Sequence, residues 1–135
     1  MADVLIDTDV ASALQKGRAP EWTNRHLVGA RVWLSFVAVA ELWKWAEVRT
    51  WGGPRRATLD AWMARRPMVP YDIEVARAWA RLSARAQLRG RPRPQNDTWV
   101  AACCIRHDLP LVTLNKRDFI DFAGYDGLVL LSEDA

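Results

Sequence analysis

Two aspartates lie where a short apolar segment of the chain ends. Asp7 follows Val4–Ile6, a run typical of a buried strand, and Asp118 follows Leu111–Thr113 after a short loop. An aspartate in such a place commonly caps or begins the next helix, and the residues beside it could fill the same role. Either acid alone therefore fits a structural role as well as a catalytic one.

Two further acids share a predicted helix face with apolar residues. Glu41 has Val37 and Trp45 one turn away on either side, and Asp97 comes one turn before Val100. Burying an unpaired carboxylate costs several kcal/mol, so Glu41 must be protonated, paired with a base or bound to a cation. A salt bridge to an arginine is the structural alternative for Glu41. For Asp97 it is a favourable position in the first turn of a helix.

All four acids can converge, because the carboxyl ends of parallel strands meet at one edge of a sheet. Without a base among them they would repel one another and raise each other's pKa, so a hard divalent cation is the natural stabiliser. Mg²⁺, with Mn²⁺ as an alternative, suits such an all-oxygen site. Zinc is disfavoured because His26 and His107 lack ligand spacing with the cysteines. A metal held this way can activate water and neutralise a phosphodiester, so the matching reaction is hydrolysis of nucleic acid.

Strands and helices alternate along the chain and would position these acids. Helix 73–88 is predicted with Asp72 as its N-cap and an apolar stripe that starts at Ile73. The alternation favours an α/β fold in one domain, residues 1–135, with a mostly parallel sheet of four or five strands between helices. Strands are predicted at 4–6, 31–36, 68–70, 111–113 and 128–131, and the other helices at 10–15, 37–49, 54–66, 96–107 and 116–122.

The composition fits a soluble globular protein. Of the 135 residues, 50% are hydrophobic and 26% are charged, which argues against disorder. The sequence has no apolar run long enough to span a membrane and no signal-peptide pattern at its start, so we expect a cytoplasmic protein without membrane contact. The two cysteines, Cys103 and Cys104, are neighbours and cannot easily form a disulfide with each other.

Positive charge is concentrated in the middle of the chain. Residues 49–93 hold eleven arginines against three acids, a net charge of +8, whereas the rest of the chain carries −5. Like charges four residues apart on a helix cost roughly 0.2–0.5 kcal/mol per pair. Four arginines recur at this spacing on the predicted helix 73–88 and just beyond it, and two more follow. They suggest a track that binds the backbone of an RNA, and a solvated helix face is the alternative. The six arginines of this track are Arg77, Arg81, Arg85, Arg89, Arg91 and Arg93.

The segments around the acids resemble a known family, the PIN domain, and more narrowly the VapC-type toxins of bacterial toxin–antitoxin pairs. The similar segments are Leu5–Val10, Leu34–Leu42, Asn96–Ala102 and Leu111–Phe119, which together extend over nearly the whole chain. The resemblance implies a three-layer sandwich and a Mg²⁺-dependent ribonuclease. The implied site comprises Asp7 and Asp97 as metal ligands, Glu41 and Asp118 binding directly or through water, and Thr8, Ser35, Thr113 and Asn115 as supporting residues.

Two positions depart from the family pattern. Asp9 stands where Asn or Ser is more common, and Leu114 stands where a second Asn is common. Neither departure removes an implied ligand, but Asp9 adds a negative charge beside the site.

The resemblance also implies two protein partners, a second copy in a homodimer and a cognate antitoxin that covers the site. The chain has eight tryptophans, and Trp43, Trp51 and Trp62 are candidates to line a groove for an antitoxin helix. Partly buried core aromatics are the alternative.

Two other functions fit parts of the pattern. Asp7 and Asp9 resemble the paired aspartates of HAD-type phosphatases. However, Ala11 stands where that family has a hydroxyl residue, and Glu41 would be unexplained. The chain could also be a catalytically silent module that binds RNA or protein, although the presence of all four acids argues against it.

Overall fold

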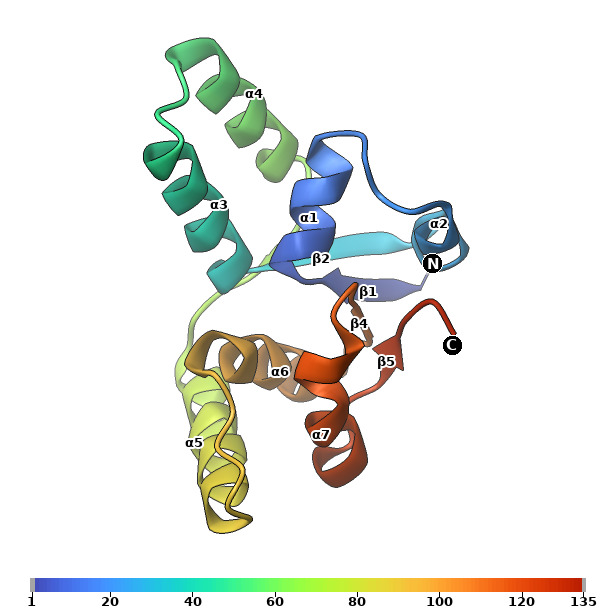
Figure 1. The fold of residues 1–135 in the computed structure, drawn as a ribbon, viewed down its shortest axis with the longest axis vertical. Coiled ribbons are helices and arrows are strands. Elements are labelled where there is room, and N and C mark those ends of the chain that lie inside the picture. The colour runs from blue at the N-terminus through green and yellow to red at the C-terminus, as the bar shows by residue number, and fades with distance from the viewer. Residues whose placement is uncertain (1, 135) are drawn as a thin grey trace.

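The computed structural model describes residues 2–134, and these form a five-stranded sheet with helices on both sides (Figure 1). The strand order is β3-β2-β1-β4-β5, and each neighbouring pair is parallel, as the sequence predicts. The strands are β1 (Asp3–Ile6), β2 (Arg31–Ser35), β3 (Met68–Val69), β4 (Leu111–Val112) and β5 (Leu130–Leu131).

Seven α-helices and one short 3-10 helix, Glu21–Thr23, connect the strands within this part of the chain. The α-helices are α1 (Thr8–Gln15), α2 (Asn24–Leu27), α3 (Phe36–Val48), α4 (Gly53–Ala64), α5 (Ile73–Leu88), α6 (Gln95–His107) and α7 (Lys116–Asp126).

Successive side chains of β1 point to opposite faces of the sheet and divide the core in two. Val4 and Ile6 pack on one side with residues of α1, α3 and α4. Leu5 packs on the other side with residues of α5, α6 and α7. In Figure 1 these two groups of helices lie above and below the sheet, which gives the three-layer sandwich that the family resemblance implies.

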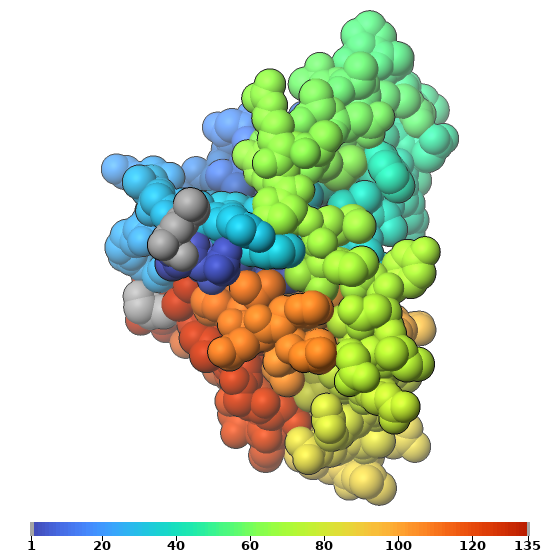
Figure 2. All heavy atoms as spheres, turned by 180° about the vertical axis from the view of Figure 1, so that it is seen from behind, coloured from blue at the N-terminus to red at the C-terminus, as the bar shows by residue number. Residues whose placement is uncertain are grey.

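The strand at one edge of the sheet, β3, links the two helical layers. It pairs with β2 alone, Leu34 opposite Met68 and Ser35 opposite Val69. Seen from behind, the segment from the end of α4 to the start of α5 runs down one side of the molecule between the layers (Figure 2).

Helix caps turn the chain directly from strand into helix at two strand ends. The Asp7 Oδ1 atom accepts a hydrogen bond from the Val10 backbone N–H at 3.0 Å and begins α1. The Ser35 Oγ atom accepts one from the Ala38 N–H at 3.1 Å and begins α3. Such caps satisfy backbone donors that have no partner within the helix. They place the starts of α1 and α3 at the carboxyl ends of β1 and β2.

The predicted elements are all present, with some shifted ends. Helix α7 continues to Asp126 rather than residue 122, because the left-handed backbone that ends it falls at Gly127, with φ of +81°. The last strand is only two residues long, Leu130–Leu131, instead of four. Ile73 was predicted to begin the apolar stripe of α5 but is 67% exposed. The stripe begins at the buried Val75 instead, which lies about 200° around the helix from Ile73.

Two other expectations concern membrane contact and disulfides. No helix in residues 2–134 is long and apolar enough to cross a bilayer. Cys103 and Cys104 are both buried in α6 with free thiols. Burial raises the pKa of the Cys103 thiol to about 12, so it stays protonated at neutral pH.

Candidate active site

The four predicted acids meet in one pocket beyond the carboxyl ends of β1 and β4. The cavity is small, about 80 Å³, and we call it the acid pocket. Its walls come from the starts of α1, α6 and α7 and from one side of α3, as expected for the ligand site of a parallel sheet. The lining residues are Asp7, Thr8, Asp9, Glu41, Asp97, Val100, Asn115, Asp118 and Phe119.

Asp7 lies deepest and is only 5% exposed. One carboxylate oxygen accepts the Val10 N–H, and the other accepts a hydrogen bond from the Thr113 hydroxyl at 2.5 Å. Burial nevertheless raises the pKa of Asp7 to about 6, and the charges of Asp9 and Asp97 act in the same direction. This carboxylate is therefore held in a fixed orientation while its charge is only partly compensated.

Glu41 projects from α3 toward the start of α1. Its Oε1 atom accepts a hydrogen bond from the Thr8 hydroxyl at 2.8 Å. Within the described residues, no Lys, Arg or His nitrogen lies within 4.0 Å of this carboxylate, so the salt bridge considered from the sequence is not formed. The acid on the apolar face of α3 is thus explained by its place in the acid pocket.

Asp97 and Asp118 stand in the first turns of α6 and α7. Burial raises the pKa of Asp97 to about 6, followed by the charges of Asp118 and Glu41, while Arg93 opposes the rise. A first-turn position alone would favour ionisation of Asp97 through the helix dipole. The raised pKa therefore reflects burial first and the neighbouring acids second.

The four supporting residues have different roles. Thr8 donates to Glu41, and Thr113 donates to Asp7 while accepting the Asn115 N–H at 2.9 Å. The Asn115 side-chain amide donates to Asp9, whose carboxylate also lines the acid pocket. Ser35 does not line the pocket and instead caps α3, the helix that carries Glu41.

The oxygen atoms of the acid pocket are the ligand type that a hard divalent cation prefers, but their positions do not form a coordination shell. Every polar side chain that lines the acid pocket offers oxygen, and burial together with the neighbouring carboxylates raises the pKa of Asp97. In the described part of the chain, however, no three His, Cys, Asp or Glu side chains already surround one point as metal ligands would. Glu41, Asp97 and Asp118 are half-buried or exposed, so their side chains have room to change rotamer.

The phosphatase alternative fits the geometry poorly. It leaves Glu41, which lines the same pocket, without a role. Asp9, the second member of that pair, is held by Asn115.

Most of the predicted arginine track is neutralised within the molecule. Arg85 and Arg89 lie 3.6 and 3.8 Å from the Asp126 carboxylate. Arg91 and Arg93 lie 2.9 and 3.7 Å from that of Asp121. In the part of the chain that the structure describes, only the remaining two arginines of the track, Arg77 and Arg81, are exposed with no carboxylate within 4.0 Å.

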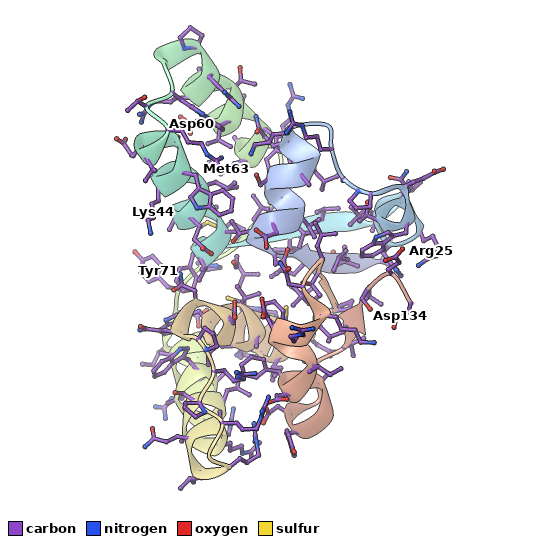
Figure 3. All side chains as sticks on the ribbon, viewed as in Figure 1. Arg25, Lys44, Asp60, Met63, Tyr71 and Asp134 are labelled. Atoms are coloured by element: carbon purple, nitrogen blue, oxygen red, sulfur yellow. The ribbon has the colours of Figure 1, made fainter. Side chains whose placement is uncertain are left out.

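The three tryptophans predicted to line one groove lie in different surroundings. Trp43 is 54% exposed and lines an apolar groove of about 290 Å³ between α3 and α4. Its Nε1–H donates to the Asp60 carboxylate at 2.9 Å, and Figure 3 shows Asp60 and Met63 on α4, toward α3. Trp51 lines a different pocket, and the half-buried Trp62 lies under the Arg66 guanidinium.

The fold and the site together define a class of α/β proteins, in which a cluster of acids lies beyond the carboxyl ends of the central strands of a parallel sheet. A model of the PIN domain matches residues 4–125 of this chain. Over 126 residues the chain is 33% identical to ribonuclease VapC5 of Mycobacterium tuberculosis, which covers 91% of this chain and 87% of that protein. The chain therefore belongs to the PIN domain family.

Solved structures agree with this assignment. VapBC2 from Rickettsia felis, crystallised with a DNA fragment from its promoter, has a TM-score of 0.81 at 18% identity and covers 96% of this chain and 98% of its own. VapBC-5 from Mycobacterium tuberculosis, a member of the VapBC family of toxin–antitoxin systems, has a TM-score of 0.74 at 25% identity. The match covers 98% of this chain and 99% of that chain.

Proposed function

We propose that this chain is a metal-dependent endoribonuclease, the toxin of a toxin–antitoxin pair that acts on cytoplasmic RNA. One observation carries the proposal: acids from α1, α3, α6 and α7 surround a single pocket, and none has a cationic partner within 4.0 Å among residues 2–134. A cluster of this kind is costly unless a cation binds to it. The similarity to a VapC ribonuclease supports the choice of RNA as substrate.

The proposed metal ligands are Asp7 and Asp97, with Glu41 and Asp118 binding directly or through water. Mg²⁺ is the proposed ion, with Mn²⁺ able to replace it. When bound, such an ion supplies Lewis-acid stabilisation of the charge that a phosphodiester gains during hydrolysis. Thr113 and the Val10 N–H hold the Asp7 carboxylate in one orientation.

The size of the acid pocket supports a polymeric substrate. At about 80 Å³ it is well below the roughly 300 Å³ of a typical small-molecule site, so it accommodates an ion and water but no nucleotide. The substrate must therefore lie across the mouth, with one phosphate at the acids. Val100 and Phe119 are the apolar side chains in the lining of the pocket.

The proposed partners are a cognate antitoxin and a second copy of the chain. The structural neighbours from Rickettsia felis and Mycobacterium tuberculosis are VapBC proteins of toxin–antitoxin systems. The apolar groove beside Trp43 is the proposed seat of an antitoxin segment, because an exposed tryptophan beside Met63 and Met68 suits an apolar helix face. Binding there should change Trp fluorescence and protect α3 and α4 from proteolysis. Unchanged fluorescence and proteolysis with a bound antitoxin would exclude this seat.

Cleavage of total RNA by the purified chain tests the proposed activity. We expect discrete products with Mg²⁺, none with EDTA, and at least about a 100-fold loss in Asp97→Asn, since a metal contributes several kcal/mol to such a reaction. Glu74→Gln is the matched control, because Glu74 is also an acid in the first turn of a helix but lies outside the acid pocket. Equal activity of the folded wild type and Asp97→Asn would contradict the proposal.

A further inference from the structure

A second pocket lies at the far ends of α1 and α3. We propose that this pocket, which we call the basic pocket, binds a backbone phosphate of the RNA whose cleaved bond lies at the acids. The inference rests on the proposed function and adds to it a binding site for the substrate. The basic pocket has a volume of about 380 Å³ and is lined by Gln15, Lys16, Arg18, Arg49, Trp51 and Arg55.

The lining holds four cationic side chains and no acid. Among residues 2–134, no carboxylate lies within 4.0 Å of any of these four, whereas most of the predicted arginine track is paired. The nearby Glu47 is already bound by Arg56 at 2.5 Å. The positive charge of the basic pocket is therefore open to a ligand from solution.

The positions of the four cations are only partly explained by helix stability. Lys16 and Arg49 cap the C-terminal ends of α1 and α3, where a cation interacts favourably with the helix dipole. Arg55 lies in the first turn of α4, where the dipole disfavours a cation, and Arg18 lies beyond α1. Burial lowers the pKa of Lys16, and the charges of Arg49, Arg18 and Arg55 lower it further, because no acid in the lining opposes them.

An aromatic ring supports one guanidinium in an orientation suited to phosphate. The Arg55 guanidinium lies 3.8 Å above the centroid of the Trp51 ring, which restrains it and leaves its N–H edges open. Arg49 lies 5.4 Å from the centroid of the Trp45 ring. Guanidinium groups bind phosphate through two parallel hydrogen bonds, so a restrained guanidinium loses less entropy on binding.

The two pockets are joined by helices that contribute to both. Helix α1 starts at Thr8 in the acid pocket and ends at Gln15 in the basic pocket, and eight residues of α-helix span about 12 Å. Helix α3 carries Glu41 and is capped by Arg49 at its far end. In Figure 1, α1 rises from the sheet alongside α3.

A phosphate chain suits this layout better than an acidic protein segment. Acids repel a polyanion, so affinity for RNA must come from cations away from the cleavage point. The basic pocket is a concentrated and unpaired set of such cations, one helix length from the acids. A chain of evenly spaced phosphates can occupy both places at once.

Binding to a labelled RNA in EDTA tests the proposal without any cleavage step. The probe is fluorescein-labelled poly(U) of about 20 nucleotides, longer than a single ssRNA-binding fold covers. We expect Arg49→Glu/Arg55→Glu to weaken binding at least about tenfold and to reduce the slope of log K against log salt by about 1.4, since each lost phosphate contact contributes about 0.7. Arg65→Glu/Arg106→Glu, with the same change of charge at exposed positions outside the basic pocket, should leave the slope near that of the wild type.

The outcomes separate this proposal from the proposed function. Equal weakening by the two double variants, or weakening by neither, overturns the basic pocket as a phosphate site, even where Mg²⁺-dependent cleavage of RNA is observed. Binding of a polyglutamate peptide but not poly(U) at the same arginines overturns it in favour of an acidic protein ligand. Arg49→Gln/Arg55→Gln, checked by circular dichroism, should reduce the slope similarly and controls for misfolding of the reversed variant.

Discussion

Helix α7 carries acids in two contrasting situations. In its first turn, Asp118 lines the acid pocket, and within the described chain no cation lies within 4.0 Å of it. Farther along, Asp121 is bound by Arg91 and Arg93, and Asp126 is approached by Arg85 of α5 and by Arg89, which caps that helix. The same residue type on one helix thus serves a candidate reaction site at one end and an interface at the other. The presence of a partner charge distinguishes the two roles.

The largest difference should appear when one acid of each kind is neutralised. We expect Asp118→Asn to lower Mg²⁺-dependent cleavage of RNA about 100-fold or more, because it removes an oxygen donor from the proposed metal site. Asp121→Asn on the same helix should keep activity within about twofold, since it removes ion pairs to Arg91 and Arg93 that lie outside the acid pocket. Single-turnover cleavage rates measure both. Equal losses of cleavage rate in the two variants would contradict the assignment of the unpaired Asp118, but not the paired Asp121, to the reaction site.

The unpaired acids of the acid pocket should make the free energy of unfolding depend on pH. In EDTA, Asp7 and Asp97 have pKa values raised from 3.8 to about 6, so folding disfavours their charged forms. Their contribution to stability is fully present below about pH 4 and is lost as the pH rises through about 6. The loss is about 3 kcal/mol for the buried Asp7, and less for the half-exposed Asp97, whose charge is screened.

Urea unfolding between about pH 4 and about pH 7 measures this effect, with Asp97→Asn as the reference. The variant should lose less stability than the wild type over the interval. Identical curves for the two proteins would show that folding does not raise the pKa of Asp97.

The smallest expected effect concerns the paired end of α7. Asp126 has a side chain that is only 1% exposed, and Asp126→Asn would leave Arg89 partly buried without its carboxylate. We expect a loss of about 2 kcal/mol in the free energy of unfolding, less than the roughly 3–5 kcal/mol for a fully buried pair because Arg85 is largely solvated. Cleavage per folded molecule should not change. A cleavage defect as large as that of Asp118→Asn would place Asp126 in the reaction site.

The fold was predictable because its signals are local. The apolar run before Asp7 and the capping position Asp72 each indicate where an element lies, and the alternation of strands and helices determines the architecture. The errors arose at helix ends and in the first turns of α5, where the apolar stripe was predicted to start at the exposed Ile73 and not at the buried Val75.

The convergence of the acids was predictable, but their contacts and the basic pocket were not. Acids at strand ends and helix starts must approach one another in any parallel sheet. The pairing of Arg85 with Asp126 joins residues far apart in sequence, and nothing in the spacing of the arginines indicates it. The grouping of Lys16 with Arg49 and Arg55 likewise depends on how α1, α3 and α4 pack.

Helix α1 acts as a spacer of fixed length. Asp7 caps its N-terminal end and Lys16 caps its C-terminal end, where the Lys16 backbone N–H donates to the carbonyl oxygens of Ser12 and Leu14. A helix of this length does not stretch, so the charges at its two ends keep the same separation while loops around them move. One inserted residue would lengthen the spacer by about 1.5 Å and turn its far end by about 100°. The distance between the two oppositely charged regions is thus set by the number of residues in one helix.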